Sequence, residues 1–154
     1  MMKFSFCMCL CIVVSSWTVL QVQGGDPWVY FASRLGRDTR FGVGSAVVFD
    51  RVAANIGNGY NPTSGIFTAP FSGYYEFKCQ LLASSPGCFE YALVSQGSYK
   101  AIILFPCSSF ATKTMSAIFH VTAGHHVWVK SHHIPGTLRG GIWSQFSGRL
   151  VRKD

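Results

Sequence analysis

Two pairs of adjacent histidines are the residues of this chain best suited to chemistry, because imidazole is a common zinc ligand. They are His125 with His126 and His132 with His133, in the segment GHHVWVKSHH. If that segment is an extended strand, the pairs lie roughly 20 Å apart, and adjacent side chains point to opposite faces. One zinc ion can then use both pairs only if the chain turns back after Lys130. We interpret all four as solvated loop histidines; the alternative is that one pair binds metal together with a neighbouring loop or subunit.

The first 24 residues have the layout of a secretory signal peptide, with Lys3, an apolar run over residues 4–20 and then small residues. The run is short for a membrane-spanning helix and holds serines at its centre, so a membrane anchor is the weaker alternative. We predict cleavage before Gly25. The mature protein is then residues 25–154, secreted, not inserted in a membrane, and of a length that suits one domain.

Export permits disulfides, and the mature chain keeps three cysteines, Cys79, Cys88 and Cys107. In EFKCQLL, Cys79 shares one face with Phe77 and Leu81, which predicts a buried, unreactive thiol. Cys88 and Cys107 are then left to pair and to close a loop of about 20 residues, which would contribute roughly 3 kcal/mol to stability. The alternative is an intermolecular bridge through the odd cysteine.

Residues for acid–base or nucleophilic catalysis are scarce. The chain holds six Asp and Glu residues, and none of them form an obvious acid–base pair. A cysteine–histidine site needs an exposed, activated thiol, whereas Cys79 is predicted to be buried. The chain also lacks a nucleophile elbow, a phosphate-binding loop and a dinucleotide-binding fingerprint. We therefore predict that the protein is not an enzyme.

Short alternating runs, separated by turn residues, follow Trp28, and helical periodicity is almost absent. This pattern is typical of a β-sandwich or jelly roll, and it predicts one all-β domain. Residues 55–65 are rich in Asn and Gly, which tolerate positive φ, so we expect a tight, irregular connection there. The predicted strands are residues 29–35, 45–52, 73–84, 88–95, 99–105, 112–121, 127–133 and 143–151.

The mature chain is basic, because loss of Lys3 reduces the formal net charge from +7 to +6. Its basic residues are scattered and nowhere form a run of five. In a secreted protein this fits sulfated or sialylated glycans, lipopolysaccharide or anionic lipid better than nucleic acid. A generally basic surface without a ligand is the alternative.

Two residues are candidate ligand contacts. Trp128 is out of phase with its neighbours Val127 and Val129, so an exposed indole there could stack on a sugar. Arg139 lies in the turn-rich segment 132–141, one of the loops expected to carry specificity. The remaining tryptophans of the mature chain, Trp28 and Trp143, are assigned to the core or to subunit contacts.

Seven residues between positions 49 and 77 have the types and the spacing of a known family. In order, they are Phe49, Asn55, Tyr60, Phe67, Gly73, Tyr75 and Phe77. The pattern resembles the globular-head domain of complement C1q, in the C1q and tumour-necrosis-factor superfamily. Residues 29–35 and 144–151 resemble the first and last strands of that domain, so the resemblance covers roughly residues 27–151. Cys79 departs from the pattern, which has an aromatic residue at that position.

The resemblance implies a ten-stranded jelly-roll β-sandwich that forms a tight homotrimer, with the first and last strands close together near its base. It also implies a disulfide, because Cys88 and Cys107 fall where complement heads carry an internal one. Arg149 replaces a residue that is usually apolar and would need a partner or water at a subunit interface. Family members often bind calcium, but calcium prefers several oxygens, and with so few carboxylates no calcium site can be placed. Calcium and zinc stay as the metals to test.

Members of this family are binding modules. The expected function is therefore that of a secreted, trimeric recognition protein for microbial or host surface glycans and lipopolysaccharide, as in innate immune, lectin-like members. One alternative is a trimeric signalling ligand for a dedicated receptor, and another is a metal-binding protein of body fluid or matrix. Salt-sensitive binding to many anionic ligands would support the first function, and nanomolar binding to one cell type the second. Stoichiometric metal uptake would support the third.

Overall fold

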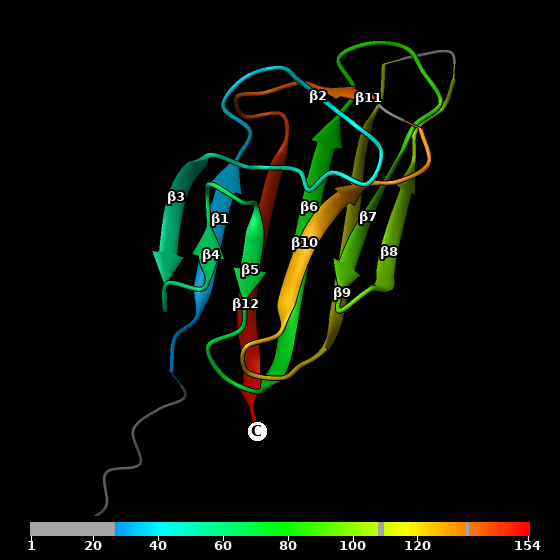
Figure 1. The fold of residues 1–154 in the computed structure, drawn as a ribbon. Helices are drawn as coiled ribbons and strands as arrows, with labels where there is room; N and C mark the ends of the chain where they lie inside the picture. The colour runs from blue at the N-terminus through cyan, green and yellow to red at the C-terminus, as the bar shows by residue number, and fades with distance from the viewer. Residues whose placement is uncertain (1–26, 108–109, 135) are drawn as a thin grey trace, which may run out of the picture.

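The computed structural model describes residues 27–107, 110–134 and 136–154. They form two five-stranded antiparallel sheets that face each other and a two-stranded sheet at one end (Figure 1). The first sheet has the order β3 (Arg51–Ile56), β1 (Tyr30–Arg34), β12 (Gln145–Lys153), β6 (Gly73–Leu82) and β9 (Thr112–Val121). The second has the order β4 (Tyr60–Asn61), β5 (Ile66–Thr68), β10 (His126–Ser131), β7 (Glu90–Ser95) and β8 (Ser98–Leu104). The small sheet pairs β11 (Gly136–Leu138) with β2 (Thr39–Phe41).

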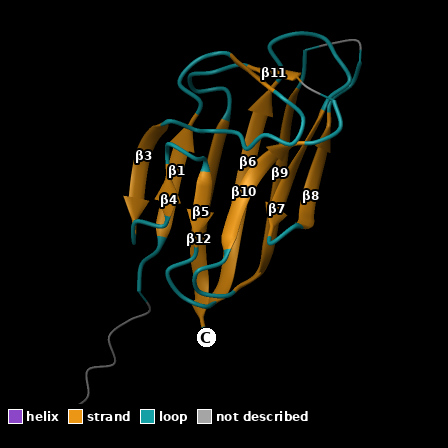
Figure 2. Ribbon diagram, viewed as in Figure 1, coloured by secondary structure: helices purple, strands orange, loops and turns teal. Residues whose placement is uncertain are grey.

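Strands and loops account for all the described residues (Figure 2), which confirms the predicted all-β class. The ten strands of the two large sheets agree with the ten that the resemblance implied, and β2 and β11 add a third, small sheet. Within the described ranges, no helix is long and apolar enough to cross a membrane. The predicted signal peptide, residues 1–24, lies outside the described residues.

The space between the sheets is filled by aromatic side chains, because apolar and polar residues alternate along the strands. In β6, Phe77 and Cys79 point inward and are buried. Phe31 of β1 stacks on Tyr60 and on Phe67, with ring centroids 4.7 Å and 5.1 Å away. Burying one phenylalanine contributes about 1.5–3 kcal/mol to folding, so these rings are the main source of stability between the sheets.

The seven residues of the family pattern extend from Phe49, just before β3, to Phe77 in β6. Its five aromatic members are all buried in the core: Phe49, Tyr60, Phe67, Tyr75 and Phe77. The Asn55 side chain donates to the Tyr60 carbonyl at 2.8 Å and accepts from the Tyr60 amide at 3.1 Å. It thereby closes a turn in which Gly57 adopts a φ of 83°, a conformation that favours glycine. Gly73 has to be small, because a Cβ there would collide with the Arg152 carbonyl.

The predicted strand over residues 45–52 is wrong. Before Arg51, the bridge from Ala46 to Lys130 is the only pairing in this segment, and the strand instead begins at Arg51 and continues to Ile56 as β3. The run is apolar because it crosses over the core: Val47 and Phe49 are fully buried, and the Val47 amide donates to the Val129 carbonyl. The short strands β2, β4, β5 and β11 also lie outside the predicted ones, because two or three residues cannot show an alternation.

Cys88 and Cys107 form a disulfide, which agrees with the sequence prediction. Cys79 is a free thiol buried in β6. Burial raises the pKa of this thiol far above its ordinary value, because a thiolate there would lose its hydration. The thiol therefore stays protonated and unreactive in the folded protein.

Candidate ligand-binding surface

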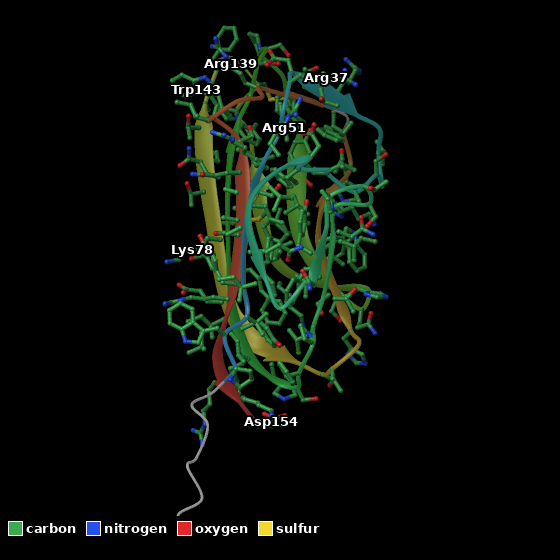
Figure 3. All side chains as sticks on the ribbon, turned by 90° about the vertical axis from the view of Figure 1, so that its left-hand side faces the viewer. Arg37, Arg51, Lys78, Arg139, Trp143 and Asp154 are labelled. Atoms are coloured by element: carbon green, nitrogen blue, oxygen red, sulfur yellow. A yellow bond between two sulfur atoms is a disulfide. The ribbon has the colours of Figure 1, made fainter. Side chains whose placement is uncertain are left out.

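Arginine side chains gather at the end of the sandwich opposite the C-terminus. Figure 3 shows Arg37, Arg51 and Arg139 at this end together with Trp143. Arg34 joins them, because it is the last residue of β1 and lies directly opposite Arg51 of β3. These five residues are all exposed, and we call them the arginine end.

The pairing of Arg34 with Arg51 places two like charges opposite each other on neighbouring strands, which is an unfavourable arrangement. Asp50 is the only carboxylate beside Arg51 among the described ion pairs, at 3.6 Å from the Arg51 Nε. Asp50 also accepts a hydrogen bond from the Gly36 amide at 2.7 Å. This carboxylate is already engaged by a backbone amide, and among the described ion pairs Arg34 has no carboxylate partner, so the two arginines keep an excess of positive charge.

Arg139 and Trp143 form the second part of the arginine end. The Arg139 guanidinium lies over the Trp143 ring, 5.6 Å from its centroid, in a cation–π contact. The Trp143 side chain is 46% exposed, so part of the indole faces solvent. The contact joins an anion-binding group to a flat apolar surface, a combination that suits an acidic sugar.

Hydrogen bonds between backbone amides and side chains fix the loop that carries Arg139 and Trp143. The Gly140 amide donates to the Asp38 carboxylate at 2.9 Å, and a Cβ on Gly140 would collide with the backbone of Arg37. The hydroxyl of the buried Ser144 accepts from the Leu82 amide at 3.1 Å. The loop between β11 and β12 is thus held against the loop that follows β1, so the backbone positions of Arg37 and Arg139 are fixed relative to each other.

The two predicted ligand contacts do not lie beside each other. Trp128 lies in the middle of β10, half-buried on the outer face of the second sheet, where it pairs with Val94 and Ile66. Arg139 has Trp143 as its aromatic partner instead. The assignment of Trp28 and Trp143 to the core is wrong, because the two side chains are 80% and 46% exposed; their role in subunit contacts stays a prediction.

The two histidine pairs lie at opposite ends of β10. At the start of the strand, the His126 Nδ1 is 3.0 Å from the Thr68 hydroxyl, and His125 precedes the strand. The strand ends at Ser131, so His132 and His133 lie beyond it, and the chain bends at His133. The predicted strand end at residue 133 is therefore wrong, and the rule that adjacent side chains point to opposite faces does not apply to this pair.

His132 and His133 meet Glu90, the first residue of β7. The His132 Nδ1 lies 2.8 Å from the Glu90 Oε2, and the two imidazole centroids are 3.7 Å apart. Ligand atoms of all three residues lie within 4.8 Å of one another. Glu90 was not among the predicted metal ligands, because it is far from the histidines in sequence and comes next to them only through the pairing of β7 with β10.

Apolar side chains are exposed on the outer face of the first sheet. Trp28 and Val151 are 80% and 51% exposed, and together with Tyr30 they line an open groove of about 450 Å³. The groove runs where the chain enters β1 and leaves β12. Exposed apolar side chains that lie together make this groove a candidate contact surface.

Arg149 lies on the same outer face, and its partner is Glu76 of the neighbouring strand β6. Its Nε donates to the Glu76 Oε2 at 2.7 Å, and the Lys78 ammonium is 2.9 Å from the other oxygen of that carboxylate. Hydrogen bonds from Lys78 and Arg149 lower the pKa of Glu76 below its ordinary value. The partner that Arg149 requires is thus supplied within one chain.

Comparison with known proteins places this chain in a family. A model of the C1q domain matches residues 29–151. A complement C1q subcomponent of Rattus norvegicus is 26% identical over 115 residues, which are 70% of this chain and 46% of that protein. Caprin-2 of Danio rerio is 26% identical over 113 residues, 70% of this chain and 12% of that protein. The chain therefore spans less than half the length of these two relatives.

Solved structures agree with this match at the level of the fold. The globular domain of the zebrafish complement 1qA protein superposes with a TM-score of 0.69 at 17% identity, covering 82% of this chain and 99% of that one. Eiger TNF from S. frugiperda gives 0.65 at 11% identity, covering 83% and 95%. Murine APRIL gives 0.61 at 12% identity, covering 79% and 99%. The fold is a C1q/TNF-type jelly roll. Because the C1q domain model matches residues 29–151, which are most of this chain, the chain belongs to the C1q domain family.

Proposed function

We propose that this protein is a secreted, non-enzymatic recognition protein that binds acidic groups on microbial or host surfaces through its arginine end. The opposition of Arg34 and Arg51 is the observation that carries the proposal. Two like charges across a strand pair repel each other, and a bound sulfate, carboxylate or phosphate group relieves that repulsion while it accepts hydrogen bonds from both guanidinium groups. Arg139 adds further donors, and the exposed ring of Trp143 offers a stacking surface for a sugar.

The proposed mature form is a homotrimer of residues 25–154. Trp28, Tyr30 and Val151 supply apolar surface for subunit contacts on the outer face of the first sheet, and Arg149 brings its own counter-ion, Glu76, into that face. A closed three-fold arrangement points three arginine ends in the same direction. Each contact is then weak, but binding to a repetitive surface gains by avidity.

A pull-down of the secreted protein on bacterial envelopes and on immobilised heparin tests the proposal. We expect binding that weakens steeply as salt rises, because exposed charges are screened. Since the arginine end holds an anion without a metal, calcium or a chelator should leave this binding unchanged. Absence of binding to every acidic surface, with saturable nanomolar binding to one cell type, would instead favour the alternative of a signalling ligand for a dedicated receptor.

A further inference from the structure

We propose that Glu90, His132 and His133 form a zinc site on the outer face of the second sheet. The three side chains offer one carboxylate oxygen and two imidazole nitrogens, all within 4.8 Å of one another. Two imidazoles and one carboxylate are a donor set that zinc prefers. The site goes beyond the proposed function, since none of its residues belong to the arginine end.

The spacing of the donors fits a tetrahedral ion after a small movement. Ligand atoms at 2.0–2.1 Å from zinc in a tetrahedron are about 3.3 Å from each other. The Glu90 Oε2 and His132 Nδ1 are 2.8 Å apart, within hydrogen-bond distance. Binding zinc between them requires these two atoms to separate by roughly half an ångström. His133 is exposed, so its ring can rotate to complete the set without disturbing the core.

The backbone holds Glu90 and His132 in place. The His132 amide donates to the Glu90 carbonyl at 2.8 Å, which extends the β7–β10 pairing by one residue beyond Ser131. The Tyr99 ring of β8 meets the His132 ring edge-on at 4.8 Å between centroids. The Cys88 disulfide also fixes the chain just before β7. Two of the three ligands are therefore positioned before any metal binds, which lowers the entropic cost of binding.

The charge around Glu90 favours a cation. Among the described residues, His132 is the only side chain within ion-pair distance of Glu90. The nearby Lys130 instead places its ammonium over the Tyr99 ring, 5.8 Å from the centroid. In a basic protein this leaves one half-buried carboxylate without an arginine or lysine partner. Three protein ligands also leave a fourth position, on the exposed side, for water or for an oxygen of a bound ligand.

Zinc titration of the secreted protein, purified from cells that express the full chain and stripped with a chelator, tests the site. We expect one zinc per chain by calorimetry, retained through gel filtration. Glu90→Gln, His132→Ala and His133→Ala should each weaken zinc binding at least tenfold. The matched control is the double variant His125→Ala/His126→Ala at the other end of β10, which should bind zinc like the wild type.

His133 separates a metal site from a simple hydrogen bond between Glu90 and His132. Its side chain is exposed, so His133→Ala should fold, and its melting temperature without zinc should equal that of the wild type. Zinc should raise the melting temperature of the wild type and of the control, and not that of His133→Ala. Equal zinc binding by wild type and His133→Ala, or loss of binding in the control, would overturn the proposal. No glycan enters this titration, so its result is independent of whether the arginine end binds anions.

Discussion

Replacing Asn55 by alanine removes both hydrogen bonds that close the turn before Tyr60. The Asn55 side chain donates to the Tyr60 carbonyl and accepts from its amide, and Tyr60 is buried. Each such bond contributes about 0.5–1.5 kcal/mol. Losing both should therefore lower the free energy of unfolding by about 1–3 kcal/mol. For a domain of this size we expect the melting temperature to fall by about 4 °C per kcal/mol, or about 4–12 °C in total.

Thermal unfolding followed by circular dichroism measures this effect. Asn55→Asp serves as a graded comparison, because aspartate keeps the acceptor for the Tyr60 amide and loses the donor to the Tyr60 carbonyl. Its melting temperature should lie between those of the wild type and Asn55→Ala. If Asn55→Ala melts with the wild type, the two hydrogen bonds do not stabilise the turn, and the structural reason given for this family position is wrong.

Three further predictions concern other sites. A thiol reagent should label Cys79 only after unfolding, and labelling of the folded protein would contradict its burial. Cys79→Ser buries a hydroxyl without a partner, so it should lower the free energy of unfolding in urea by about 1–3 kcal/mol, more than Cys79→Ala does. Hydrogen bonds from Lys78 and Arg149 lower the pKa of Glu76 in the folded protein. Its contribution to stability is therefore complete above the ordinary pKa of 4.5 and is lost as the pH falls through the lower folded pKa. Across this pH range the melting temperature should fall less for Glu76→Gln than for the wild type, and parallel curves would show that the ion pairs of Glu76 do not stabilise the fold. Gly140→Ala should lower both the melting temperature and heparin affinity, since the added methyl group collides with the Arg37 backbone; unchanged values would show that this loop tolerates displacement.

The long strands could be predicted from sequence because their alternation persists over many residues. β9 begins and ends where the alternating run predicts, at Thr112 and Val121. β3 could not be predicted, since burial of Val47 and Phe49 in a connection produces the same apolar run as a strand. Periodicity alone does not separate these two causes.

The two surfaces proposed as binding sites depend on contacts between distant segments. Arg34 and Arg51 are ordinary surface arginines until the β1–β3 register places them opposite each other. Glu90 and His132 are likewise brought together by the pairing of β7 with β10. The histidine pair was predicted to diverge because the strand was expected to reach residue 133, and it converges because the strand ends two residues earlier.

Charge-matched variants test the central claim most directly, namely that anionic ligands bind at the arginine end. The perturbed variant is Arg34→Gln/Arg51→Gln, and its control is Lys100→Gln/Lys153→Gln, which removes the same charge from outside the arginine end. Each lost charge-assisted hydrogen bond costs about 1.5 kcal/mol or more of binding free energy. The arginine variant should therefore bind heparin about tenfold more weakly per lost contact. The lysine variant should bind heparin nearly as tightly as the wild type does. Equal affinities of the two variants would mean that binding follows net charge alone, and would contradict a site at the arginine end.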